Sequence, residues 1–281
     1  MTESRKRVVL ITGCSSGIGK ALAEAFRKKG YTVAATARRK ESVDELAAAG
    51  YDAFMLDVVD ETSIKKAVDQ IRQKLSRIDV LVNNAGFGLM GPTAEVSVSD
   101  LRRQLEVNVV GQIAVTQAVI PAMIEQKEGR IVNMGSISGI QATPFSGAYC
   151  ASKAALHALS DSLRMELAPF GIKVIIVQPG AIESEFGNNA KVNMGELDVE
   201  SSIYRDIIEM VQKRAEISQD SPMPTEKFAE MVVEQVIKAD PPAVFRKGPH
   251  SLEATIADKL LPTFLKDKIL TRKFGLNRIR R

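Results

Sequence analysis

The chain has 281 residues, of which 45% are hydrophobic and 26% charged, the proportions of a globular protein with an ample core. The net charge is +4, and the body of the chain has no basic patch interleaved with aromatic residues, which argues against nucleic acid as a partner. Two cysteines, Cys14 and Cys150, form neither a disulfide framework nor a metal-ligand spacing, and indicate a reducing, cytoplasmic location without a metal site. No apolar run approaches the roughly 20 residues of a spanning helix or the roughly 7–15 of a signal peptide.

Strand and helix patterns alternate along nearly the whole chain. Strands are predicted at 8–11, 31–37, 51–56, 79–82, 130–134, 172–177 and, more briefly, 244–246. Helices are expected after the first strand and over 60–76, 99–126 and 146–168, with Asp60 as the N-cap of the second. Such alternation predicts an α/β fold, a doubly wound parallel sheet of about seven strands with helices on both faces.

The first predicted strand, Val8-Val9-Leu10-Ile11, leads directly into a turn with glycines at 13, 17 and 19 and then into a helix pattern. Glycines permit a sharp turn and a close approach of backbone to ligand, and a helix N-terminus attracts anions. The turn therefore indicates a pyrophosphate site. Its spacing departs from the common Gly-x-Gly-x2-Gly pattern, so a tight turn without a ligand is the alternative.

Other polar or glycine-containing segments also follow predicted strands, namely Asp57, the run Asn83-Asn84-Ala85-Gly86, Ser136 and Pro179-Gly180. Ligands of doubly wound sheets bind at the carboxyl ends of the strands. These segments are therefore expected to share one site with the glycine turn.

Tyr149 and Lys153 lie four residues apart in a predicted helix and so share one face. A phenol titrates near 10, and a neighbouring ammonium lowers that pKa toward the range useful for acid–base catalysis. Taken alone, the pair could equally be a solvated Tyr-Lys pair on a helix surface.

Jointly, the motifs resemble those of a single-domain short-chain dehydrogenase/reductase, over about residues 5–248. The motifs that carry the resemblance are Thr12-Gly13-x3-Gly17-Ile18-Gly19, Asn83-Asn84-Ala85-Gly86, Asn108-x2-Gly111, Ser136, Tyr149-x3-Lys153 and Pro179-Gly180. Ser184 stands where the family commonly has threonine, and retains the hydroxyl. The resemblance implies a Rossmann-like catalytic domain over 1–250, with a substrate-binding lid at 179–225, and a homodimer formed through the two long helices.

The resemblance also implies catalytic roles. Tyr149 would exchange a proton with the substrate oxygen, and Lys153 would lower the Tyr149 pKa and hold the nicotinamide ribose. Ser136 would stabilise the developing oxyanion, and Ser138 is a less well spaced alternative to it. Asn108 would position a water that relays protons to Lys153.

The second strand is followed by Arg38 and Arg39, and no acidic residue occurs between Tyr31 and Lys40. An arginine here accommodates the 2′-phosphate of NADP(H), whereas NAD enzymes carry an acidic residue. Alternatively, the two arginines only open a solvated loop. Asp57 is expected to contact the adenine, and the alternative is that it only caps the next helix. The full set of expected cofactor contacts is Thr12, Gly13, Ser15, Ser16, Gly17, Ile18, Gly19, Arg38, Arg39, Asp57, Val58, Asn84, Ala85, Gly86, Asn108, Tyr149, Lys153, Pro179, Gly180, Ile182 and Ser184.

The segments expected to border the substrate are apolar and offer no arginine pair for an anionic group: Phe87, Leu89, Met90, Ile140, Phe145, Ile203, Tyr204, Ile207, Ile208 and Val211. An apolar cleft with one polar end suits a steroid-, retinoid- or acyl-lipid-like ketone or aldehyde and its alcohol. The alternatives are a small-substrate NAD-dependent alcohol dehydrogenase, a sugar-nucleotide epimerase or dehydratase, and a dinucleotide-sensing regulator. The short sequence after Gly180 disfavours an epimerase or dehydratase, and the intact Tyr-Lys pair disfavours a regulator.

The segment 251–281 places apolar residues among basic ones, and 241–281 holds ten Lys/Arg against three Asp/Glu. Such a basic amphipathic segment can contact an anionic membrane surface. The alternative is that it packs on the body beside the substrate cleft.

Overall fold

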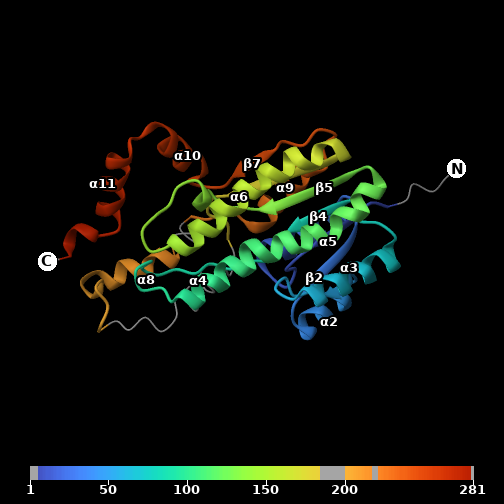
Figure 1. Cartoon of the computed structure of the whole chain (residues 1–281), viewed down its shortest axis with the longest axis horizontal. Helices are drawn as coiled ribbons and strands as arrows, with labels where there is room; N and C mark the ends of the chain where they lie inside the picture. The colour runs from blue at the N-terminus through green and yellow to red at the C-terminus, as the bar shows by residue number, and fades with distance from the viewer. Residues whose placement is uncertain (1–5, 184–199, 217–220, 280–281) are drawn as a thin grey trace.

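A computed structural model describes residues 6–183, 200–216 and 221–279. Its centre is a parallel seven-stranded sheet in the order β3-β2-β1-β4-β5-β6-β7 (Figure 1). The strands are β1 (Val8–Ile11), β2 (Thr32–Ala37), β3 (Asp52–Met55), β4 (Val80–Asn83), β5 (Gly129–Met134), β6 (Ile172–Pro179) and β7 (Val244–Lys247). The doubly wound sheet predicted from the sequence is confirmed, with strand ends shifted by at most two residues.

The buried strand β1 lies at the middle of the sheet, paired with β2 on one side and β4 on the other. The strand order reverses direction between these two neighbours, which leaves a crevice above the end of β1. The glycine turn emerges at that point.

Helices cover both faces of the sheet, as the alternating side chains of β1 require. Val9 and Ile11 pack beneath α1 (Gly17–Lys28), α2 (Lys40–Ala48) and α9 (Thr225–Val236), where Phe26 and Phe228 are fully buried. Leu10 packs on the opposite side, beneath α3 (Glu61–Leu75), α5 (Gly111–Gln126) and α6 (Gly147–Leu167). Removing either buried phenylalanine side chain would cost about 3–5 kcal/mol.

The helix predicted over 99–126 is interrupted. It consists of α4 (Val98–Leu105), a π-helical segment η1 (Glu106–Val110) and α5. Within the described ranges, this run is the one helix long and apolar enough to span a membrane by length and composition, and half of its most apolar window is buried. Val115, Val119 and Met123 of α5 belong to the core, so the apolar character of the run is that of a helix covering a sheet.

The C-terminal region packs on the segment between β6 and α9. Its helices are α10 (Ser251–Leu260), α11 (Thr263–Lys273) and η6 (Leu276–Arg278). In Figure 1, α10 and α11 lie above α8 (Ile208–Glu216), at the left of the view. Phe274 joins Phe145, Ile207 and Val211 in a separate apolar cluster. The remaining short helices are η2 (Ile137–Gly139), η3 (Ala168–Phe170) and η4 (Arg205–Ile207). Residues 184–199 of the expected lid lie outside the described residues.

Candidate active site

The turn after β1 is built for a ligand with negative charge. Gly13 and Gly17 have φ angles of +72° and +54°, which favour glycine, and a Cβ on Gly19 would lie 2.1 Å from the Gly13 carbonyl oxygen. Helix α1 begins here, its N-cap Ser16 makes no side-chain capping bond, and its first turn has no acidic residue. The first N–H groups of α1 are therefore available to an anion.

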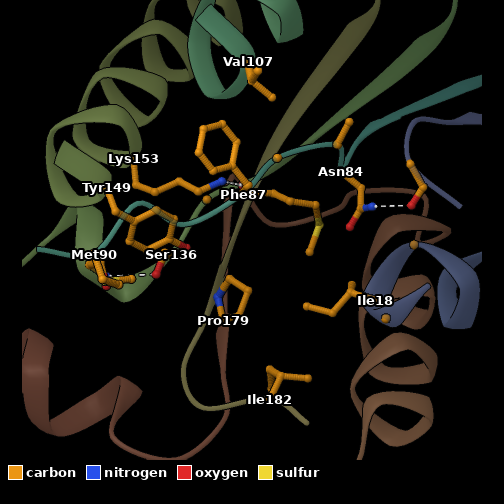
Figure 2. Close-up of a pocket in the computed structure, with 18 of the residues that line it drawn as sticks. Ile18, Asn84, Phe87, Met90, Val107, Ser136, Tyr149, Lys153, Pro179 and Ile182 are labelled. Carbon is orange, nitrogen blue, oxygen red and sulfur yellow. Dashed lines mark hydrogen bonds between the residues drawn. The ribbon is translucent and has the colours of Figure 1, made fainter. Parts of the chain in front are cut away.

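Thr12 and Asn84 tie this turn to the end of β4. The Thr12 hydroxyl accepts hydrogen bonds of 3.0 Å from the backbone N–H groups of Asn84 and Ala85. The Asn84 side-chain amide donates to the carbonyl oxygens of Thr12 and Gly13, both at 3.0 Å (Figure 2). Thr12 is fully buried, so its contribution is to position the turn.

A cavity of about 980 Å³ extends along the carboxyl ends of the strands. Of the residues expected at the site, Thr12 and Asn108 do not line it, and Ser184 lies outside the described residues. Those that line it are Gly13, Ser15, Ser16, Gly17, Ile18, Gly19, Arg38, Arg39, Asp57, Val58, Asn84, Ala85, Gly86, Ser136, Tyr149, Lys153, Pro179, Gly180 and Ile182. Figure 2 places Ile18 and Asn84 across the cavity from Tyr149.

Tyr149 lies beside Ser136 near the start of α6 (Figure 2), and the two side chains are hydrogen-bonded. Burial raises the pKa of the Tyr149 phenol to about 12, while the Ser136 hydrogen bond and the charge of Arg214 act in the opposite direction. The Ser136 oxygen also accepts from the Ser138 backbone N–H at 3.1 Å. The geometry therefore favours Ser136 over Ser138 as the hydroxyl that accompanies Tyr149.

Lys153 is buried, and its ammonium donates a 2.7 Å hydrogen bond to the Met134 carbonyl oxygen. Burial lowers the pKa of Lys153 to about 8. Ser136 and Arg214 are the groups that lower the Tyr149 pKa here, and the expected effect of Lys153 on that pKa stays a prediction. The ammonium is held at the end of β5, where Lys153 lines the cavity.

Asn108 lies in the π-helical segment and is fully buried. Its side-chain oxygen accepts from the Phe87 N–H at 3.0 Å, and its amide donates to the Phe87 carbonyl and to the Ser152 hydroxyl. The side chain therefore fixes the loop after β4. Single π-helical turns frequently mark functional sites. That Asn108 positions a water stays a prediction. Because its side chain is engaged by Phe87 and Ser152, the backbone of this segment would have to bind the water.

Arg38 and Arg39 are exposed at the rim of the cavity, between β2 and α2. In the part of the chain that the structure describes, neither forms an ion pair. Asp57 also lines the cavity and accepts from the Val59 N–H at 3.2 Å. Asp60, as predicted, caps α3 through bonds to the N–H groups of Thr62 and Ser63, so Asp57 is not needed there.

Four charged side chains that the sequence analysis did not single out also line the cavity: Arg103, Lys213, Arg214 and Lys273. Although no arginine pair was expected beside the substrate, two arginines, Arg103 and Arg214, therefore line the cavity. Arg214 follows Ile207 and Val211 by seven and three residues, on the same helical face. An arginine at a core position of an amphipathic helix was the feature of the sequence that could have indicated a buried arginine here. Of the expected apolar residues, Phe87 and Met90 line the cavity, whereas Phe145, Ile207 and Val211 form the cluster beneath it.

His157 lies on α6, one turn after Lys153. Its ring contacts the Ser136 N–H at 3.4 Å and the Gln178 amide at 3.3 Å. Burial lowers its pKa to about 4, so the ring is neutral at physiological pH. His157 supports the segment that carries Ser136.

Residues 7–194 match the short chain dehydrogenase family. The chain is 32% identical over 272 residues to an NADPH-dependent 3-dehydrocapnine reductase of Ornithobacterium rhinotracheale, covering 94% of this chain and 95% of that protein. It is 35% identical over 246 residues to an NADPH-dependent 1-acyldihydroxyacetone phosphate reductase of Schizosaccharomyces pombe, covering 86% and 80%. The fold is similar to that of a short-chain dehydrogenase from Streptomyces avermitilis, with a TM-score of 0.78, 31% identity, and coverage of 99% and 98%.

Proposed function

The chain belongs to the short-chain dehydrogenase/reductase family, and from this premise we propose that it is an NADP(H)-dependent oxidoreductase that interconverts a hydrophobic ketone or aldehyde and its alcohol. The observation that carries the proposal is the buried Tyr149–Ser136 pair, with Lys153 beside it, across one cavity from the glycine turn. A sensor without catalysis would have no need for this buried acid–base group.

The cavity fits a dinucleotide. Gly19 leaves no room for a side chain against Gly13, so the backbone of the turn can closely approach a pyrophosphate at the start of α1. Arg38 and Arg39, at the end of β2, would hold a 2′-phosphate, and Asp57 would accept from the adenine amino group. The remaining contacts proposed are those of the glycine turn, the Asn84-Ala85-Gly86 run and Pro179, Gly180 and Ile182.

When bound, the nicotinamide supplies the hydride for reduction or takes it in oxidation. Tyr149, with a pKa raised to about 12, holds its proton at neutral pH and is ready to donate it to the carbonyl oxygen. Ser136, already hydrogen-bonded to Tyr149, would stabilise the negative charge that develops on that oxygen. Lys153 would hold the nicotinamide ribose hydroxyls and carry protons toward Tyr149.

The substrate end of the cavity is lined by large apolar side chains, which suits a lipid-like carbonyl compound: Phe87, Met90, Val107, Met210, Leu270 and Phe274. Relatives named as reductases of 3-dehydrocapnine and of 1-acyldihydroxyacetone phosphate support this choice. A small-substrate, NAD-dependent alcohol dehydrogenase is the alternative. Oxidation of NADPH, followed by absorbance with a long-chain 3-oxo compound and with acetoin, separates the two. A clear preference for acetoin would overturn the lipid-like assignment.

Two exposed apolar surfaces support a homodimer and a contact with a membrane. Exposed apolar side chains on the long helices (Val110, Leu159 and Met165) favour a homodimer through α5 and α6. On the C-terminal segment, Leu252, Ile256 and Leu260 follow one another at helical spacing on one exposed face of α10. That face, beside the basic residues of α11, favours peripheral contact with an anionic membrane.

A further inference from the structure

Arg214 of α8 is a buried cation that has no acidic partner among the described residues. Only 7% of the residue is exposed, and within the described residues no carboxylate lies within ion-pair distance of its guanidinium. Its Nε donates to the Thr143 hydroxyl and its Nη2 to the Ser146 hydroxyl, both at 3.1 Å. Neutral hydroxyls do not compensate the charge, and burying an unpaired charge costs several kcal/mol.

The guanidinium retains donor capacity toward the cavity. Of its five N–H groups, Thr143 and Ser146 use two, and the other three, on Nη1 and Nη2, have no acceptor among the described residues. Arg214 lines the cavity together with Lys213, Arg103 and Lys273, all three exposed. Among the described lining residues the one carboxylate is Asp57, at the end of β3, on the proposed adenine side. The substrate end is thus positively charged as well as apolar.

We propose that Arg214 binds an oxyanionic group of the substrate, a carboxylate, phosphate ester or sulfonate, carried within a few bonds of the reacting carbonyl. The short separation follows because the Arg214 guanidinium bonds Ser146, the N-cap of α6, and Tyr149 lies in the first turn of that helix and lines the same cavity. The apolar side chains Phe87, Met90 and Phe274 would then contact the hydrocarbon part. This assignment rests on the proposed oxidoreductase function and narrows its substrate class to amphiphilic anions.

Two other roles for Arg214 make different predictions. If the arginine only activates Tyr149, its loss lowers kcat for every carbonyl substrate, charged or not. If it only holds the loop of Thr143 and Ser146, its loss lowers the melting temperature and affects all substrates alike. An anion anchor is distinguished by a selective rise in KM for anionic substrates.

The test compares substrates that differ in one charge. One pair is 3-oxododecanoate and its methyl ester, and the other is 1-dodecanoyl-dihydroxyacetone phosphate and its unphosphorylated counterpart. In at least one pair we expect the anion to be favoured in kcat/KM by about 10- to 100-fold, the range of a hydrogen-bonded charge. Arg214→Gln should abolish that preference through KM and leave the uncharged member within about threefold. The pair that responds identifies carboxylate or phosphate.

The controls separate charge from folding. Arg205→Gln removes an exposed arginine of the same region that does not line the cavity, and should leave the preference intact. Arg214→Lys keeps the charge without the planar donor set, so it should retain part of the preference even if Arg214→Gln folds poorly. Equal activity of wild type toward both members of each pair, or a parallel loss of both in Arg214→Gln, would overturn the assignment.

A binding measurement keeps this test independent of turnover. If no carbonyl compound oxidises NADPH, the proposed function fails, and calorimetric titration of the NADP⁺-loaded protein then addresses Arg214 alone. The titrants are 3-hydroxydodecanoate with its methyl ester and glycerol 1-dodecanoate 3-phosphate with its unphosphorylated form. We expect an anion to bind more tightly to wild type than to Arg214→Gln. Equal binding of all titrants to both proteins would refute the anion site.

Discussion

Lys153 and Tyr149 lie one helical turn apart on α6, where the Lys153 ammonium lies over the Tyr149 ring, 5.8 Å from its centre, and donates its hydrogen bond to the Met134 carbonyl. Both groups are buried, and burial favours the neutral form of each, which raises the pKa of Tyr149 to about 12 and lowers that of Lys153 to about 8. The proton is therefore held on the phenol at neutral pH. The proposed reduction of a carbonyl group requires such a protonated phenol.

Tyr149→Phe tests the acid directly, because it removes the hydroxyl and keeps the ring. We expect turnover with NADPH and a long-chain ketone to fall about 100-fold or more, while NADPH binding, followed by fluorescence, is preserved. Tyr51→Phe is the matched control, since it removes a hydroxyl that bonds Glu24 outside the cavity. Comparable turnover in Tyr149→Phe and wild type would contradict the mechanism.

Lys153→Met should stabilise the fold while it abolishes activity. Below about pH 8 the folded and unfolded chains both hold the Lys153 proton, and the folded protein bears the cost of the buried charge. Between about 8 and the ordinary value of 10.5 the unfolded chain binds more protons, so the stability of wild type rises with pH and the cost disappears. The variant's advantage in free energy of unfolding should be roughly 1–3 kcal/mol near neutral pH and shrink above about pH 8.

Urea denaturation of both proteins at several pH values measures this difference. Lys127→Met is the control, because Lys127 is exposed and its substitution should give no such pH-dependent gain. If Lys153→Met is less stable than wild type at every pH, the hydrogen bond to Met134 outweighs the cost of burying the charge.

Arg38→Asp should shift cofactor preference. The carboxylate repels a 2′-phosphate and can accept from a 2′-hydroxyl, so the ratio of kcat/KM for NADPH over NADH should fall by about 100-fold. Arg102→Asp makes the same change in charge on α4, outside the cavity, and should not alter the ratio. A wild-type protein that already prefers NADH would show that Arg38 does not select the cofactor.

Much of this architecture could be predicted from local sequence patterns. The run Val8–Ile11 has the composition of a strand buried on both faces, and its position before Gly13 locates the switch point of the sheet. Residues that follow parallel strands meet at one edge by topology alone. For this reason Ser136 and Asn84 could be assigned to one site without coordinates.

The parts that escaped prediction depend on contacts between distant segments. Arg214 reaches Thr143 and Ser146 only because α8 folds across the start of α6, and no local spacing encodes that approach. Phe274 lies more than one hundred residues from Phe145, yet their rings meet edge to face at 6.2 Å. The hydrogen bond from Lys153 to the Met134 carbonyl also could not be predicted, because it joins α6 to the end of β5, a segment distant in sequence.

Because Phe274 packs on Phe145, membrane association should not be tested by deleting the C-terminal segment. The expectation that the C-terminal segment packs beside the cleft is confirmed for one of its faces, where Leu270, Lys273 and Phe274 line the cavity. Deleting the segment would expose that cluster and create an artificial apolar surface. Substitutions on its exposed face avoid this problem.

Leu260 and Phe264, which are 74% and 72% exposed, are the residues to change. Wild type should co-sediment with vesicles rich in anionic lipid, since each basic residue near the surface contributes about 1 kcal/mol and apolar side chains add to it. The double variant Leu260→Glu/Phe264→Glu should remain in the supernatant with unchanged NADPH-dependent activity toward a dissolved substrate. Val98→Glu/Phe170→Glu introduces the same charges at exposed apolar positions of the body, and should still sediment. Equal recovery of wild type in the supernatant with and without vesicles would exclude this membrane contact.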